Sequence, residues 1–173
     1  MFVGLVHSLA LLLLVAAVAK LRDAGSATVA LRRAGVPSAA VGVRGLALAE
    51  ASLAAAVLFV GGPVPAVALG LLHLGFAGFI VRLRRAAGAT ASCGCFGGSE
   101  APAGRLHVVV NAAAAAGVAV ALTDALPSAP TVFGDLAALA VPYGLAVAMA
   151  AWAIGLCLTS LPAVLAAHRP VTA

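Results

Sequence analysis

The sequence predicts an all-α fold, a polytopic membrane bundle of five transmembrane helices in which four form a core and one is added. Hydrophobic residues make up 64% of the 173 residues, charged residues make up 9%, and the mean hydropathy is +1.19. Average soluble domains contain about 45–50% apolar and about 25% charged residues, so an ordinary soluble domain is excluded. Intrinsic disorder is excluded too, because it requires low hydrophobicity. The spacing of the apolar stretches and the one-sided placement of the basic residues complete this prediction.

A transmembrane helix needs about 20 apolar residues, with a range of about 17–25. Five stretches reach or approach this length, at residues 2–19, 41–60, 66–81, 106–122 and 136–158. The first ends at the charged run that begins with Lys20, and the second contains Arg44 and Glu50. A tight turn is expected at residues 61–65, because glycine and proline do not continue a helix.

The fifth stretch contains Pro142 and is followed by Pro162, and each proline is expected to kink or limit the helix. The longest polar stretches, residues 20–40 and 86–104, are interpreted as loops, so the whole chain forms a single integral membrane domain. The segment 17–19 resembles a signal-peptide cleavage site. No basic region precedes the first apolar stretch, however, which favours a retained helix.

The basic residues all fall on one side of the predicted bundle. They lie in or beside the first and third connections and after the last helix, at Lys20, Arg22, Arg32, Arg33, Arg44, Arg82, Arg84, Arg85, Arg105 and Arg169. Because basic loops stay in the cytoplasm, we expect the N-terminus outside a bacterial cell membrane and the C-terminus and loop 86–104 in the cytoplasm. The net charge of +5 therefore indicates orientation in membrane lipid, and no nucleic-acid partner is expected.

Loop 86–104 contains the run Cys93-Gly94-Cys95-Phe96-Gly97. Two cysteines separated by one glycine can close a small disulfide ring, and Gly94 tolerates the backbone conformation that such a ring requires. Strained disulfides have higher reduction potentials and are the labile or catalytic ones. Arginines on both sides of the loop are expected to lower the pKa of a thiol. Phe96 is expected to dip into the membrane interface, and Gly97 to let the loop fold back on it.

Three interpretations of Cys93 and Cys95 stay open. The first is a redox-active dithiol, in which these two residues are catalytic. The second is a soft-metal site with His107 as a third ligand, because thiolates favour zinc and copper(I). The third is a structural pair, which is less expected at a cytoplasmic face because cytosolic disulfides are usually transient. His107 lies one helical turn from the loop and is also a candidate base or thiolate partner.

Three polar residues lie inside the predicted helices in one band of the bilayer. Glu50 is six residues from Arg44 and Asn111 is six residues from Arg105, which is about 9 Å at ~1.5 Å per residue. His73 lies somewhat deeper, about 13 Å from the end of its helix. An intramembrane carboxylate costs at least about 2.5 kcal/mol and is functional by default. We expect Glu50 to be protonated or paired with His73, in a proton relay or a quinone head-group pocket; the alternative is a hydrogen-bonded network that only fixes helix packing.

These features together resemble the MauE/DoxX group of redox-associated membrane proteins, and the methylamine-utilisation MauE branch in particular. The resemblance rests on the charged run at 20–23, Glu50, the segment 93–97, and Arg105 with Asn111, and it covers most of residues 1–122. It implies a small helical bundle that exchanges thiols and disulfides with a thioredoxin-like partner. MauE-like proteins are associated with maturing a disulfide-rich periplasmic enzyme subunit, and DoxX-like and DoxD-type relatives with sulfur-compound oxidation and quinone reduction.

The leading hypothesis is a membrane thiol–disulfide oxidoreductase that uses Cys93 and Cys95, with a membrane quinone near Glu50 as its candidate cofactor. A second hypothesis is a non-enzymatic membrane subunit that anchors or matures a redox complex. A third is a carrier of soft metals or thiol compounds. The charge pattern places the dithiol at the cytoplasmic face, whereas a periplasmic folding role requires it outside, so the resemblance and the charges favour different orientations.

Overall fold

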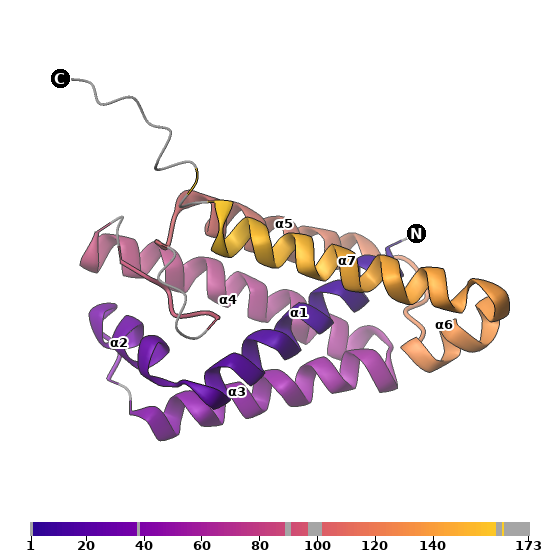
Figure 1. Cartoon of the computed structure of the whole chain (residues 1–173), viewed down its shortest axis with the longest axis horizontal. Coiled ribbons are helices and arrows are strands. Elements are labelled where there is room, and N and C mark those ends of the chain that lie inside the picture. The colour runs from indigo at the N-terminus through magenta and orange to yellow at the C-terminus, as the bar shows by residue number, and fades with distance from the viewer. Residues whose placement is uncertain (1, 38, 89–90, 97–101, 162–163, 165–173) are drawn as a thin grey trace.

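The computed structural model describes residues 2–37, 39–88, 91–96, 102–161 and 164, and over these residues the fold is helical with no strand (Figure 1). The helices follow one another as α1 (Val3–Arg22), α2 (Gly25–Arg33), α3 (Ala40–Ala55), α4 (Pro63–Ala87), α5 (Arg105–Ala121), α6 (Ala129–Leu136) and α7 (Ala140–Thr159). A π-helical segment, Ala56–Val60, extends α3, and a 3-10 turn, Ala137–Leu139, joins α6 to α7.

The fold confirms the predicted helical membrane bundle. In the described part of the chain, four segments are long and apolar enough to cross a membrane, namely Val3–Arg22, Ala40–Val60, Pro63–Ala87 and Ala129–Thr159. The helix Arg105–Ala121 is also apolar but shorter, at 17 residues. Leu and Val side chains cover much of the outer surface, as expected where lipid replaces water as the surrounding solvent.

Helix α1 lies in the middle of the bundle, where it packs against α3, α5 and α7, while α4 packs along α5. Leu9 of α1, Leu69 of α4 and Val118 of α5 are almost fully buried in the resulting core. Small residues allow the close approach of the helices. A methyl group added at Gly70 would lie 3.3 Å from the Val118 side chain. In lipid, such backbone proximity is a main source of helix association.

The turn after α3 is shorter than predicted. It consists of Gly61 and Gly62, both with positive φ, and α4 begins directly at Pro63. Proline suits the first position of a helix because its missing N–H has no partner there. The Gly62 N–H donates to the Leu126 carbonyl at 2.7 Å, so this turn packs against the connection between α5 and α6.

The stretch 20–40, interpreted as a loop, differs from that interpretation because it contains helix α2. Its buried side chains are Ala27, Thr28 and Ala30, whereas Arg33 on another face is exposed. The Asp23 carboxylate accepts a hydrogen bond of 2.8 Å from the Gly25 N–H at the start of the helix. An amphipathic helix of nine residues is too short to span a bilayer, and it lies against the end of the bundle.

The last apolar segment contains a short helix, α6, before the predicted span 136–158. The helical segment begins at Ala129 and breaks at Ala137, which has a φ of 44°, and not at Pro142. Pro142 lies in the first turn of α7, where no intrahelical N–H bond is lost. His7 of α1 fixes this end of α7, because its Nδ1 lies 2.7 Å from the Tyr143 hydroxyl. Pro162 lies outside the described residues.

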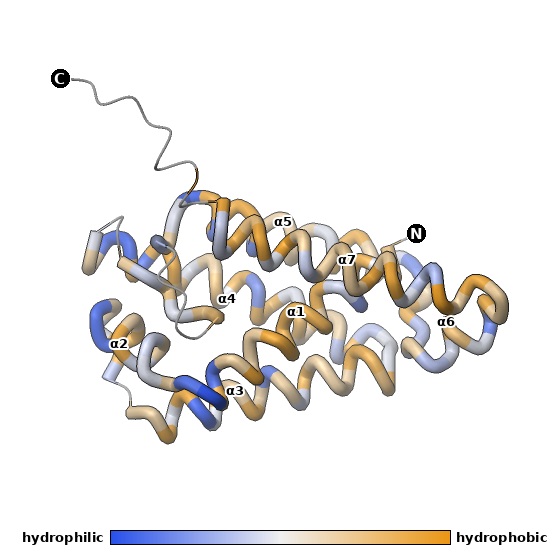
Figure 2. The backbone as a smooth tube through the Cα atoms, in the orientation of Figure 1, coloured by the Kyte–Doolittle hydropathy of each residue, from blue (hydrophilic) through white to orange (hydrophobic). Residues whose placement is uncertain are grey.

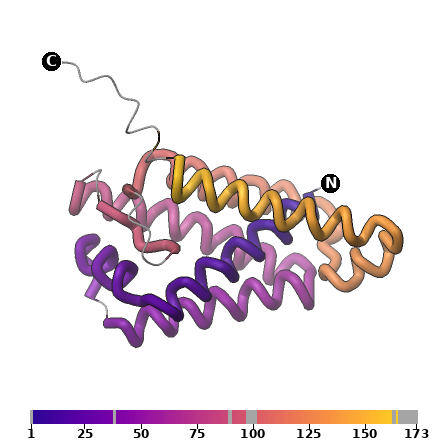
Figure 3. Tube along the Cα trace, viewed as in Figure 1, coloured from indigo at the N-terminus to yellow at the C-terminus, as the bar shows by residue number. Residues whose placement is uncertain are grey.

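Every described lysine and arginine lies at one end of the bundle, which is called the basic end below. This end holds the C-terminal ends of α1 and α4, the start of α5 and helix α2 (Figure 3). Figure 2 shows the strongest hydrophilic colour around α2 and the last turn of α1. The segment that contains the paired cysteines enters the bundle from this end.

Candidate functional site

The cysteine-containing segment, called the dithiol loop and described at residues 91–96 and 102–104, is closed at its base. The Ala103 N–H donates to the Ala91 carbonyl at 2.8 Å, and an isolated antiparallel bridge pairs Ser92 with Pro102. Arg84 at the end of α4 donates to the Ala103 carbonyl, also at 2.8 Å. Ala91 and Ala103 are buried, so the base of this loop is packed into the bundle. Gly97 lies outside the described residues.

Gly94 brings the dithiol loop into direct contact with α2. Its φ is +64°, and a Cβ added there would lie 2.6 Å from the backbone nitrogen of Ala27. Glycine is therefore required for two separate reasons, the backbone conformation and the lack of space. The sequence indicated the first reason only, because α2 was not anticipated.

The Cys93 sulfur lies in an environment that stabilises negative charge. Cys93 is 7% exposed, and its sulfur accepts hydrogen bonds from the Cys95 thiol, from the Cys95 N–H at 3.3 Å and from the His107 ring. The bond from the Cys95 thiol is the main cause that lowers the pKa of Cys93 to about 5. Burial opposes this shift, and His107 and the Cys95 N–H add to it. A thiolate is the reactive form of cysteine in exchange reactions.

The pKa of the Cys95 thiol is shifted in the opposite direction. Its hydrogen bond to Cys93 is the main cause that raises the pKa of the Cys95 thiol well above its ordinary value; burial and the charge on Cys93 act in the same direction. The side chain is partly exposed and faces an internal cavity, with the charges of Lys20 and Glu50 close enough to act on it. The pair is thus asymmetric, with a shielded thiolate and a more accessible thiol.

The expected effect of the flanking arginines on the thiols was wrong. Arg84 is engaged with the Ala103 carbonyl, and the Arg105 side chain is exposed beside it in a separate groove. The groups that lower the pKa of Cys93 are instead Cys95 and His107. A direct hydrogen bond acts more strongly on a buried sulfur than a screened charge at an exposed position does.

Glu50 forms a buried ion pair with Lys20, and not the expected pair with His73. The Lys20 Nζ lies 2.8 Å from Glu50 Oε2, and the two side chains are 7% and 1% exposed. Lys20 also lies over the Phe76 ring, 5.8 Å from its centroid. Lys20 was interpreted only as a marker of orientation. The signal that identifies it is its position in the last turn of an apolar helix, where a lysine can turn inward.

His73 pairs with Asn111 instead. The His73 Nδ1 lies 2.9 Å from Asn111 Oδ1, and Asn111 Nδ2 donates to the His107 carbonyl at 2.8 Å, so α4 and α5 are joined beneath the dithiol loop. Among the described residues, His73 Nε2, His107 Nδ1 and Glu50 Oε1 have no hydrogen-bond partner. The three intramembrane residues do lie in one region, as their depth along the helices predicted.

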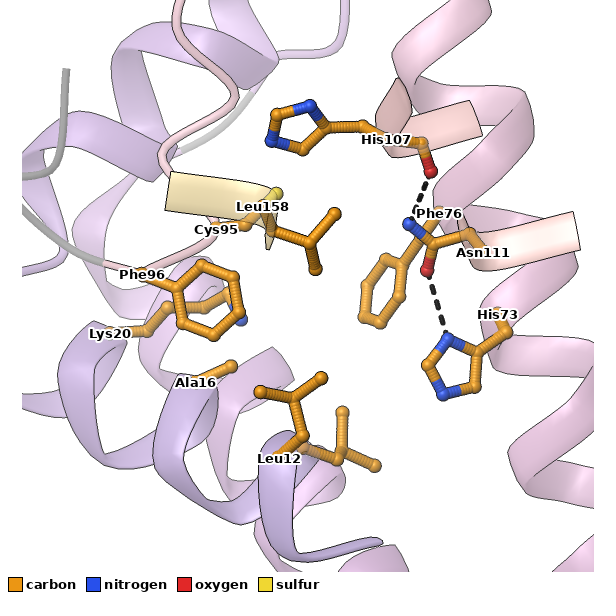
Figure 4. Close-up of a pocket in the computed structure, with 11 residues that line it drawn as sticks. Leu12, Ala16, Lys20, His73, Phe76, Cys95, Phe96, His107, Asn111 and Leu158 are labelled. Atoms are coloured by element: carbon orange, nitrogen blue, oxygen red, sulfur yellow. Dashed lines mark hydrogen bonds between the residues drawn. The ribbon is translucent and has the colours of Figure 1, made fainter. Parts of the chain in front are cut away.

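A small cavity of about 50 Å³ lies between Cys95, Lys20 and the His73–Asn111 pair (Figure 4). Its polar lining residues are Lys20, His73, Cys95, His107 and Asn111. Leu12, Phe76, Phe96 and Leu158 supply apolar walls. Phe96 is therefore inserted between α1 and α7, deeper than an interfacial position.

This cavity does not fit a quinone ring. An apolar cavity of about 150 Å³ is known to hold benzene, whereas ~10–15 Å³ suffices for a water molecule. The cavity is therefore sized for a few waters, and its polar lining offers them partners. Within the described residues, no group of three or more His, Cys, Asp or Glu side chains is arranged to hold a metal ion. The groups at this site that can react by themselves are the thiols of Cys93 and Cys95, through thiol–disulfide exchange.

Comparison with known proteins gives one match. The family model for methylamine utilisation protein MauE matches residues 2–124, which is more than two thirds of the chain and includes both cysteines, Glu50, His73, His107 and Asn111. Searches of curated proteins and of solved structures find no match. The match spans α1 to α5 and therefore all the residues around the cavity except Leu158. This chain belongs to the MauE family, described as methylamine utilisation protein MauE.

Proposed function

We propose that the protein is a membrane thiol oxidant, which uses a Cys93–Cys95 disulfide to oxidise the dithiol of a thioredoxin-like partner. The observation that carries this proposal is the set of three hydrogen bonds to the Cys93 sulfur. Such stabilisation of a thiolate favours the reduced form of the pair. A dithiol whose reduced form is stabilised has a disulfide that accepts electrons readily.

The exchange begins with attack of a partner thiolate on Cys95, which is the less buried residue of the pair. A bond forms between the partner sulfur and Cys95, the Cys93–Cys95 bond breaks, and Cys93 leaves with the electron pair as a thiolate. Low-pKa thiols are the better leaving groups. The second partner thiol loses its proton to water and attacks the first partner sulfur, and Cys95 leaves as a thiolate and takes up a proton. The partner loses two electrons and the pair gains them.

Lys20 and Glu50 support this exchange as positioning residues. The Lys20 ammonium favours negative charge on Cys95 when that sulfur leaves, and Glu50 opposes it. Because Glu50 holds Lys20 at 2.8 Å, the ammonium stays beside the cavity instead of turning out to the membrane surface. Asn111 and His73 hold the His107 backbone between α4 and α5, which fixes the ring that contacts Cys93.

The family name suggests the setting, which is the maturation of a protein needed for methylamine utilisation. We further propose the orientation that the basic residues favour, with the basic end and the dithiol loop at the cytoplasmic face of a bacterial cell membrane. A C-terminal reporter that is active only in the periplasm should then be inactive. Periplasmic activity of that fusion would reverse the orientation and move the partner to the outer face.

Trapping of mixed disulfides tests the exchange. In a Cys157→Ser background, Cys93→Ser should accumulate a mixed disulfide between Cys95 and a thioredoxin-fold protein. Cys95 can still attack the disulfide of the oxidised partner, and no Cys93 thiol is left to release that partner by forming the Cys93–Cys95 bond. Cys95→Ser leaves only the enclosed Cys93 and should trap at least about tenfold less. Cys157 lies in α7, so the Cys157→Ser variant alone is the matched control and should behave as wild type.

Equal trapping by both variants would contradict the assigned order of attack. A pair that stays fully reduced in cells, with no mixed disulfide in either variant, would exclude the oxidant and favour the non-enzymatic membrane subunit. That alternative has one observation in its favour, which is the 7% exposure of Cys93.

A further inference from the structure

A groove at the basic end lies outside the dithiol site and combines charge with an apolar floor. It measures about 640 Å³ and runs between the end of α4 and the start of α5. Three arginines and three valines line it: Arg84, Arg85, Arg105, Val81, Val108 and Val109. No acidic side chain is among the described residues that line it.

The order of these residues along the helices matches the structure of a phospholipid. Helix α4 runs toward the basic end, so Val81 lies one turn deeper in the membrane than Arg84 and Arg85. Helix α5 runs away from that end, so Val108 and Val109 lie one turn deeper than Arg105. The guanidinium groups are therefore at head-group level and the valines at the level of the acyl chains.

The arginines are available for a ligand. Arg85 and Arg105 are exposed, and neither has an ion-pair partner among the described residues. Gly104 offers no side chain to cap α5, so the first N–H groups of that helix add positive potential at the same place. Guanidinium groups bind phosphate oxygens with a geometry that a single ammonium cannot supply.

We infer that this groove binds an anionic phospholipid, with its phosphate at Arg85 and Arg105 and an acyl chain along the valines. Basic pockets between transmembrane helices at the cytoplasmic side recognise such head groups. Arg84 lines the groove and also holds the Ala103 carbonyl at the base of the dithiol loop. The bound lipid therefore lies next to the contact that keeps this loop in place.

The test uses the purified full chain and lipid titrations followed by native mass spectrometry. Phosphatidylglycerol and phosphatidylcholine with identical acyl chains are the probes. Wild type should retain phosphatidylglycerol at least about tenfold better than phosphatidylcholine. Each arginine near an anionic surface contributes about fivefold in affinity. The double variant Arg85→Gln with Arg105→Gln should therefore bind phosphatidylglycerol roughly 25-fold more weakly than wild type.

Arg33→Gln with Arg44→Gln is the matched control, because it removes the same charge from exposed positions at the same end. It should keep the wild-type preference. Equal binding of the two lipids by wild type, or equal losses in both double variants, would overturn the site. Displacement of the lipid by excess inorganic phosphate would also overturn it, since the groove would then be a simple anion site.

Discussion

Lys20 of α1 and Glu50 of α3 form an ion pair of 2.8 Å that is nearly enclosed by the helices around it. The two side chains come from helices that pack along each other, so the pair joins the central helix to its neighbour. It also places a positive charge beside Cys95, at the cavity that His73, His107 and Asn111 line as well. A structural contact and an electrostatic influence on the dithiol thus depend on the same two residues.

Removing one member of this pair should lower the stability of the protein much more than removing both members. Loss of one partner of a buried ion pair costs about 3–5 kcal/mol, because the other charge is left unpaired. Lys20→Met should therefore lower the apparent melting temperature in detergent by roughly 10 °C. Lys20→Met combined with Glu50→Leu should recover most of that loss. Arg44→Met is the control, and an equal effect of Lys20→Met and Arg44→Met would show that the pair contributes nothing.

The hydrogen bond from Cys95 should determine the pH at which Cys93 reacts. The pKa of Cys93 is lowered to about 5, so the thiolate forms above that pH and is lost as the pH falls through it. In a Cys157→Ser background, Cys95→Ser keeps a hydroxyl donor and Cys95→Ala does not. Alkylation of Cys93 by iodoacetamide at pH 6.5, relative to its own high-pH plateau, should be about tenfold slower in Cys95→Ala than in Cys95→Ser.

Normalising each variant to its plateau separates the ionisation of Cys93 from its limited accessibility. Coincident pH profiles for the Ser and Ala variants would contradict the hydrogen bond between the two thiols.

His107 should affect the same pH profile. Its ring donates to Cys93 and its charge acts in the same direction, so His107→Ala should raise the pKa of Cys93 and move the alkylation midpoint upward. His73→Ala is the matched control, since His73 lies on the same cavity but bonds Asn111. A midpoint that moves equally in both variants would indicate a general loosening of the cavity and not a contact with the thiolate.

The helical bundle, its apolar segments and the location of the cysteines were predictable from the sequence, because each depends on composition and local order. Glu50, His73 and Asn111 were predicted to lie together because depth along a helix follows from residue counts. Their partners were not predictable, since rotation about the helix axis decides that Glu50 meets Lys20. Helix α2 was missed because its amphipathic pattern extends over only nine residues of low overall hydropathy, which is too short to stand out within a polar stretch.

The contact between the dithiol loop and α2 can be tested at Gly94. Alanine there must adopt a φ of +64° and place its Cβ 2.6 Å from the Ala27 nitrogen, so Gly94→Ala should push the loop away from α2. Gly88→Ala is a close control, because Gly88 has a φ of +85° but no atom within 4 Å of an added Cβ. Backbone strain of this kind costs about 1–3 kcal/mol and is common to both variants.

The difference between the two variants therefore isolates the steric contact. Cys93 is enclosed partly because its loop lies on α2, so Gly94→Ala should raise the high-pH alkylation rate of Cys93 by about an order of magnitude, whereas Gly88→Ala should leave it near wild type. If both variants react at the same rate, the burial of Cys93 does not depend on α2. The helix would then be a neighbour of the dithiol loop without a part in shielding the thiolate.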